Sequence, residues 1–279
     1  CMLSRTMSSR SGNRGECSQP CRLTYDLTDA TARKLRSGKH LLSVRDLDLS
    51  SHIGEMIDDG ICSFKVEGRL KDISYIKNVV AHYRRRIDEE LAARPAVQRS
   101  SVGESVIDFT PNPAKSFTRG ESSYMFEGKR AGVASFDTPK AVGEYVGRVA
   151  RVDSRTFSLD RSAELAAGDG LCFIADGALT GTNVNSVEGR RITPNRIEGI
   201  TRGAEVYRNF DQRFRLALDR SRTRRVIPAT AMVAFDSEGV TLRYTDCEGY
   251  AGEARLDEQL DAASNLERME QTLREQVVR

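Results

Sequence analysis

Three cysteines near the start of the chain have a spacing that could suit metal chemistry. Cys17 and Cys21 are separated by three residues, and Cys1 lies 16 positions before Cys17. Thiolates are soft ligands that bind zinc or iron–sulfur clusters, usually four to a site. Three ligands are one short of that number, so a metal site and ordinary free thiols both stay open. Neighbouring arginines favour the metal site, because adjacent cations lower the pKa of a thiol.

A second group of residues that could do chemistry is Lys65, Glu67 and Arg69, in the segment SFKVEGRLKD. Alternate residues of a strand point to the same face, so these three side chains would lie together on a predicted strand. The two cations would suit an anionic ligand, and the carboxylate would suit base or hydrogen-bonding work. The alternative is a structural ion pair, which is a common arrangement.

Other catalytic signatures are missing from the sequence. The three histidines, His40, His52 and His82, have neither metal-ligand nor triad spacing. The chain has no Gly-x-Ser-x-Gly elbow, no His-Glu-x-x-His motif and no phosphate-binding loop. The absence of these motifs means that the sequence gives no support to a hydrolase.

Composition and charge are typical of a globular protein with basic segments. Of 279 residues, 39% are hydrophobic and 30% are charged, and no apolar run is long enough for a membrane helix. Residues 1–22 account for the whole net charge of +3, and a second basic run covers residues 208–225. Basic segments can contact phosphates, so we predict RNA contacts at Arg10, Arg14 and Arg22. A solvated surface is the alternative.

The first third of the chain alternates between strands and helices. We predict strands at His40–Asp46 and Ile61–Gly68, a short helix at Ser50–Asp59, and a long amphipathic helix that Asp72 caps. This order is typical of the last two units of an α/β barrel, and it predicts an incomplete TIM-like barrel end. In such a barrel the C-terminal ends of the strands face the active site.

A boundary follows at Ala93–Gly103, where Arg94-Pro95 stops the helix. We therefore predict two domains, residues 1–93 and residues 94–279, the second mainly β. Its predicted elements are a hairpin at Val146–Asp160, a strand within Glu164–Ile174, a strand pair at Val226–Phe235 and Val240–Thr245, and a terminal helix within Asp257–Val278.

Several long stretches resemble one family. The segment GNRGECSQPCRLTYDL (Gly12–Leu27) resembles the signature region of the collagenase-like peptidases, peptidase family U32. The segments LLSVRDLDLS and SFKVEGRLKDISYIKNVVAHYRRRID resemble further stretches of that family. Residues 94–279 resemble the collagenase-associated domain of one branch, through KSFTRG, AVGEYVGRV, GDGLCF and VYRNFD.

The resemblance implies an RNA-modifying enzyme. Members of that branch hydroxylate a cytidine of 23S ribosomal RNA, and a sister branch hydroxylates a wobble uridine of transfer RNA. The implied partner is therefore ribosomal or other structured RNA in the cytoplasm, with no membrane. Oligomeric state is not predicted. The alternatives are a peptidase that acts on collagen-like proteins and an RNA-binding fragment without catalysis.

The resemblance also implies cofactors and an incomplete chain. A fourth cysteine of the family pattern falls before residue 1, so Cys1, Cys17 and Cys21 would be three ligands of an iron–sulfur site. Prephenate is the implied cosubstrate, and Lys65 and Arg69 are candidates for binding its carboxylates. We expect the chain to be an internal fragment that lacks the first part of the barrel.

Overall fold

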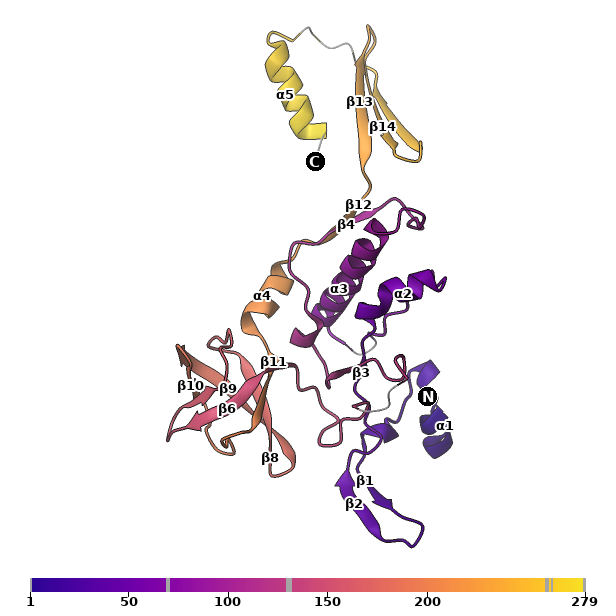
Figure 1. Cartoon of the computed structure of the whole chain (residues 1–279). Helices are drawn as coiled ribbons and strands as arrows, with labels where there is room; N and C mark the ends of the chain where they lie inside the picture. Colours follow the sequence, from indigo (N-terminus) through magenta and orange to yellow (C-terminus); the bar gives the residue numbers. More distant parts are fainter. Residues whose placement is uncertain (1, 69–70, 129–131, 259–260, 262, 278–279) are drawn as a thin grey trace. The chain divides into compact units, whose positions relative to one another are not determined.

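The computed structural model describes residues 2–68, 71–128, 132–258, 261 and 263–277, in two compact units. One unit comprises residues 1–93 and 109–221, and the other comprises residues 94–108 and 222–279. Figure 1 shows their elements in sequence colours. The chain leaves the first unit at the predicted boundary after residue 93, but it returns at residue 109. The predicted second domain is thus divided between the two units.

The first unit begins with short helical elements and a hairpin. They are α1 (Met2–Ser8), the 3₁₀ turns η1 (Gly12–Arg14) and η2 (Pro20–Arg22), and an antiparallel hairpin of β1 (Tyr25–Thr28) and β2 (Lys34–Lys39). Most of the hairpin side chains are exposed. Neither strand therefore has the apolar alternation by which a sequence reveals a half-buried strand.

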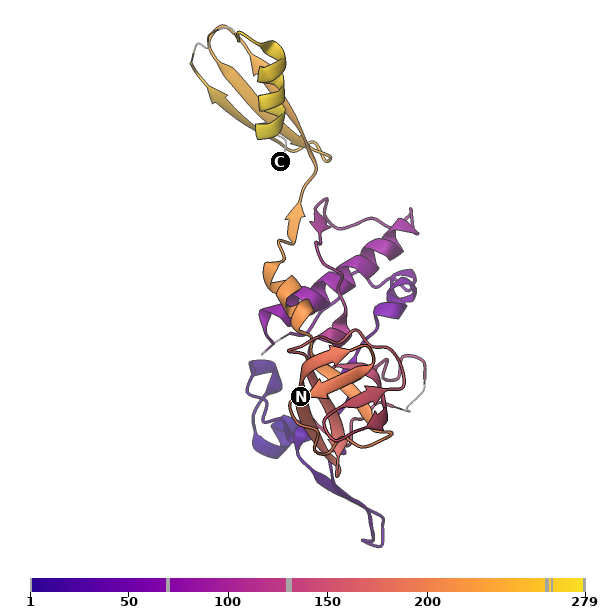
Figure 2. The same ribbon diagram turned by 90° about the vertical axis from the view of Figure 1, so that its left-hand side faces the viewer.

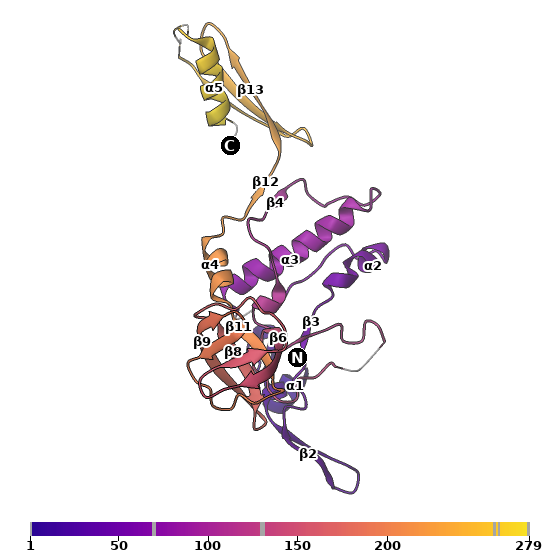
Figure 3. The same cartoon turned by 60° about the vertical axis from the view of Figure 1, so that its left-hand side comes forward.

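The two predicted helices of this region are confirmed as α2 (Ile53–Asp58) and α3 (Ile73–Ala92). Asp72 caps α3 by accepting a hydrogen bond from the backbone N–H of Tyr75, at 2.8 Å. The Tyr83 hydroxyl, on α3, donates to the Asp48 carboxylate and accepts from the Leu49 N–H. These bonds hold the start of η3 (Ser50–His52) and α2 beside α3 (Figure 3).

The two predicted strands of this region are largely wrong. Residues 61–68 form no strand, and Ile61 and Val66 are 43% and 38% exposed. Of residues 40–46, only Asp46 belongs to a strand, β3 (Asp46–Leu47), which pairs in parallel with β5 (Glu121–Ser122). A strand needs hydrogen-bonded neighbours, and the described residues provide none beside residues 61–68. The TIM-like barrel end stays a prediction.

Residues 144–210 form a closed β-barrel (Figure 2). Buried apolar side chains fill its core. Its strands are ordered β10-β7-β6-β11-β8-β9. The predicted hairpin is confirmed, since β6 and β7 pair antiparallel around residues 153–156. Phe157, Leu171 and Phe173 are at most 2% exposed. The strands are β6 (Glu144–Val152), β7 (Phe157–Leu159), β8 (Gly170–Ala175), β9 (Ala178–Glu188), β10 (Arg191–Pro194) and β11 (Glu205–Phe210).

Gly143, immediately before β6, allows the chain to enter the barrel close to β11. Its φ is +79°, and a Cβ here would overlap the backbone carbonyl of Arg208. We expect Gly143→Ala to destabilise the protein by roughly 3 kcal/mol or more, because a rigid backbone group must move and the left-handed conformation is strained. Chemical denaturation measures this loss. Gly189→Ala is the matched control, since Gly189 has a similar φ of +60° and nothing within 4 Å of the added Cβ. Equal losses in both variants would show that backbone strain alone matters.

The first unit ends with α4 (Gln212–Arg220), which follows β11 directly. Asp211 caps this helix by accepting from the Phe214 N–H at 2.9 Å. The turn η4 (Pro113–Lys115) lies near both, because the Lys115 ammonium is 2.7 Å from the Asp211 carboxylate.

The described part of the second unit contains a two-stranded sheet, a three-stranded sheet and a C-terminal helix. Tyr244, on β14, donates its hydroxyl to the carbonyl of Val277 at 2.9 Å, which fastens α5 beside the sheet. The predicted strand pair is confirmed as β13 and β14, and the predicted terminal helix as α5. Among the described residues, none of the helices is long and apolar enough to span a bilayer. The elements are β4 (Glu104–Val106) paired with β12 (Arg224–Val226), the sheet of β13 (Ala229–Phe235), β14 (Val240–Asp246) and β15 (Ala251–Leu256), and α5 (Leu266–Val277).

Candidate functional site

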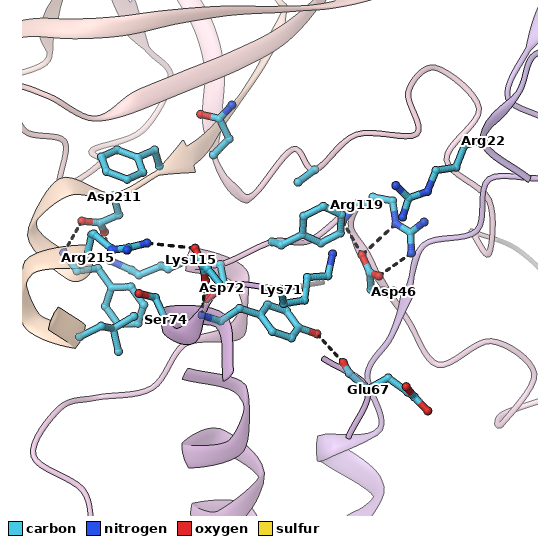
Figure 4. Close-up of a pocket in the computed structure, with 18 of the residues that line it drawn as sticks. Arg22, Asp46, Glu67, Lys71, Asp72, Ser74, Lys115, Arg119, Asp211 and Arg215 are labelled. Carbon is cyan, nitrogen blue, oxygen red and sulfur yellow. Dashed lines mark hydrogen bonds and ion pairs between the residues drawn. The ribbon is translucent and has the colours of Figure 1, made fainter. Parts of the chain in front are cut away.

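The first unit contains a cavity of about 890 Å³ that segments far apart in the sequence enclose. Its wall combines the loop around η2, β3, the start of α3, the segment after η4, and the start of α4. Figure 4 shows many of its side chains. Its lining includes cysteines, charged residues and aromatic residues, namely Cys17, Cys21, Arg22, Asp46, Glu67, Lys71, Asp72, Tyr75, Lys115, Phe117, Arg119, Asp211, Phe214 and Arg215.

Two of the three predicted cysteine ligands line this cavity. Cys17 and Cys21 are both half-buried free thiols. Cys1 lies outside the described residues, and the described residues include no group of three or more His, Cys, Asp or Glu that could hold a metal ion. The pKa of Cys17 is lowered, chiefly because the Gln19 N–H donates to its sulfur at 3.4 Å and further because Ser4 and Arg10 are near. A lowered pKa favours the thiolate, the form that binds metals.

Serine hydroxyl groups fasten the cysteine loop onto α1. Ser4 is fully buried, donates to the Arg10 carbonyl at 2.8 Å and accepts from the Ser18 N–H at 3.0 Å. The Ser8 hydroxyl lies 2.7 Å from that of Ser18. Gln19 has the left-handed φ of +55°, which turns the chain between the two cysteines.

Lys65 and Glu67 do not form the predicted catalytic face. Their side chains are 85% and 74% exposed and form an ion pair at 2.9 Å. This pairing raises the pKa of Lys65 and lowers the pKa of Glu67. Glu67 lines the cavity and Lys65 does not. Arg69 lies outside the described residues, so the role predicted for it stays a prediction.

Most of the cations that line the cavity are paired with carboxylates. Arg119 binds Asp46 with both forks of its guanidinium, at 2.7 and 3.3 Å. In Figure 4, the Arg215 side chain reaches Asp72, and the contact measures 3.1 Å. Lys115 pairs with Asp211, as described above. These pairs neutralise their charges and hold the wall in place.

Arg22 and Lys71 differ from those cations. Within the described parts of the chain, neither side chain has a carboxylate within salt-bridge distance, although both line the cavity. Their positive charges are therefore available to an anionic ligand. The predicted RNA contact Arg22 thus belongs to the cavity wall, whereas Arg10 and Arg14 are exposed and lie outside it. No sequence pattern pointed to Lys71, because only the fold brings it near Arg22.

Comparison with known proteins confirms the resemblance. Residues 1–134 match the model of Peptidase family U32. The chain is 34% identical, over 99% of its length, to the 23S rRNA 5-hydroxycytidine C2501 synthase of Escherichia coli, of which it covers 44%. It is 35% identical over 56% of its length to the tRNA hydroxylation protein P1 of Bacillus subtilis, covering 38% of that protein. A collagenase of Porphyromonas gingivalis is 28% identical over 74% of the chain, which covers 56% of it. The chain thus spans about half the length of these relatives.

Proposed function

We propose, from the match of residues 1–134 to Peptidase family U32 and from the relatives above, that this chain is part of an enzyme that hydroxylates a pyrimidine base of RNA. We place the substrate base in 23S ribosomal RNA, as a cytidine. The observation that carries this proposal is the similarity, over 99% of the chain, to a relative named as a 23S rRNA 5-hydroxycytidine synthase. A cytoplasmic location would follow from such a substrate.

We propose that an iron–sulfur cluster binds at the cysteine loop. Cys17 and Cys21 fit this group, because two half-buried thiols line one cavity and the surroundings of Cys17 favour its thiolate. Cys1 is the third predicted ligand. A bound cluster supplies one-electron redox chemistry. The protein's own contribution is to hold the loop through Ser4 and Ser18.

We propose that prephenate, the implied cosubstrate, binds in the same cavity. Lys65 is outside the lining, so it is a poor candidate for the carboxylates. Arg22 is a better one, because its guanidinium faces the cavity without a carboxylate partner among the described residues. An arginine can bind a carboxylate through two parallel hydrogen bonds. Arg69, which lies outside the described residues, remains the other candidate predicted for the carboxylates.

The variant Arg22→Ala tests whether the activity depends on the cavity or on the outer basic surface. We expect the variant to lose roughly 10- to 100-fold in RNA hydroxylation, because a charge-assisted hydrogen bond contributes about 1.5–3 kcal/mol. Arg14→Ala is the control, since Arg14 is exposed and outside the cavity, and it should change hydroxylation less than about threefold at physiological salt. The full-length protein is assayed by mass spectrometry of nucleosides from treated ribosomal RNA. Equal losses in both variants would favour general contact with phosphates.

A peptidase is the second candidate, because two collagenases of Porphyromonas gingivalis are among the relatives. A strain that lacks the gene decides between the candidates. Loss of hydroxycytidine from 23S ribosomal RNA, restored by the full-length gene, supports the hydroxylase. Unchanged ribosomal RNA together with cleavage of denatured collagen by the pure protein supports the peptidase. RNA binding without either activity would leave the third possibility, a non-catalytic RNA-binding module.

A further inference from the structure

Lys71 lies in surroundings that differ from those of the other lysine of the cavity. Lys115 has the Asp211 carboxylate at 2.7 Å, whereas Lys71 has no such partner among the described residues. Its ammonium lies 2.8 Å from the centre of the Phe117 ring and 5.7 Å from that of Tyr75. In the view of Figure 4, Lys71 lies between the Asp46–Arg119 pair and the Lys115–Asp211 pair. A lysine in this position is held against an apolar wall and remains open to the cavity.

Partial burial of Lys71 favours the neutral, nucleophilic form of its amine. Burial lowers the pKa of Lys71, and the positive charges of Arg22 and Arg119 lower it further. Asp46 and Asp72 act in the opposite direction. Both of these carboxylates are engaged elsewhere, Asp46 with Arg119 and Asp72 with Arg215. Desolvation and neighbouring cations are the two means by which proteins convert a lysine into a nucleophile.

We propose that Lys71 forms an imine with the carbonyl group of a 2-oxo acid whose carboxylate pairs with Arg22. The neutral amine attacks the carbonyl carbon, a C–N bond forms, and the oxygen takes up a proton. The resulting carbinolamine then loses water to give the imine, so amine and carbonyl yield imine and water without any oxidant. The cavity of about 890 Å³ has ample room for such a ligand. This proposal depends on the proposed function only for the identity of the natural ligand. Prephenate, the proposed cosubstrate, carries a 2-oxo carboxylate.

Reductive trapping tests this proposal on the full-length protein. Pyruvate or glyoxylate is added with sodium borohydride, which reduces an imine to a stable secondary amine, and the modified lysines are mapped by mass spectrometry. We expect modification of Lys71 to exceed that of Lys65 at least about tenfold, because Lys65 is 85% exposed and ion-paired. Lactate, which has no carbonyl group, should give no adduct. Modification spread over surface lysines, with Lys71 no higher than Lys65, would overturn the proposal.

Variants separate this chemistry from folding and from RNA hydroxylation. Lys71→Arg keeps the charge and should remove the trapped adduct with an unchanged thermal midpoint, whereas Lys115→Arg should keep the adduct. Arg22→Ala should reduce trapping at low pyruvate and recover it at high pyruvate, because it removes the carboxylate contact and leaves the amine. If trapping at Lys71 succeeds and no RNA is hydroxylated, the proposed function is wrong but the imine proposal stands. If Lys71→Arg hydroxylates RNA at the normal rate and no adduct forms in the parent protein, the imine proposal is wrong but the proposed function stands.

Discussion

Replacing either Cys17 or Cys21 by Ser is expected to remove the iron of the proposed cluster and to reduce the proposed RNA hydroxylation by more than about 100-fold. Changing even a group outside the ligand shell costs 10- to 100-fold in many metal sites, and a ligand itself matters more. Both thiols line the same cavity, and a hydroxyl group does not replace a soft thiolate. Iron and sulfide content, the visible absorption of the purified full-length protein and its hydroxylation of ribosomal RNA are measured together.

Cys62→Ser and Cys247→Ser are the matched controls, because both thiols are exposed and neither lines the cavity. They should keep the iron content and activity of the parent protein. Thermal melting distinguishes a lost cluster from a misfolded chain. Full iron occupancy in a well-folded Cys17→Ser variant would remove the proposed cluster from this loop.

Replacing Arg208 by Met is expected to destabilise the first unit by roughly 3–5 kcal/mol. Removing one partner of a buried ion pair leaves uncompensated charges, and these cost more than the lost attraction. Arg208 is 5% exposed and contacts Asp169 and Asp211 at 3.2 Å each, as well as Glu144. Asp169 is fully buried. Denaturation with urea at neutral pH measures the change.

Arg148→Met is the control for the loss of an arginine on the same barrel. Arg148 pairs with Glu205, but both side chains are about half exposed, at 54% and 42%. Exposed pairs contribute about 0–1 kcal/mol, so little change is expected. If Arg208→Met were no worse than Arg148→Met, the buried network would have no special role.

The Arg208 network also connects the barrel to the cavity. Asp211 accepts from Lys115, caps α4 and contacts Arg208, and α4 carries Phe214 and Arg215 into the cavity wall. The pKa of Asp211 is lowered: burial alone would raise it, but Lys115, the Phe214 N–H and Arg208 outweigh burial. The Arg208 network is thus one of the contacts through which the barrel holds this side of the cavity.

Local patterns were sufficient for the elements whose signals are short-range. Asp72 capped the predicted helix as expected, and the turn at residues 153–156 joins the predicted hairpin. Caps, turns and apolar periodicity depend on neighbours within a few residues, so the sequence shows them directly. The family resemblance likewise depends on contiguous segments, and the match over residues 1–134 confirms it.

The predicted strand over residues 61–68 shows where local patterns fail. Its alternation of apolar and charged residues resembled a half-buried strand, but a strand forms only beside partners that the segment cannot specify. Without them Lys65 and Glu67 pair with each other at the surface, which is the structural alternative considered for this segment.

The cysteines and the cavity show the same contrast between what the sequence determines and what the tertiary structure decides. The sequence by itself determined that Cys17 and Cys21 lie close along the chain and among arginines, because that is a matter of spacing. Only the tertiary structure decided that Arg22, Lys71 and Phe117 meet at one cavity, and that Asp46 is neutralised by Arg119 while Lys71 is left without a carboxylate among the described residues. Those properties depend on pairings between segments 40 to 100 residues apart. Burial and ion pairing set the chemistry of a charged side chain, and both arise only when the chain is folded.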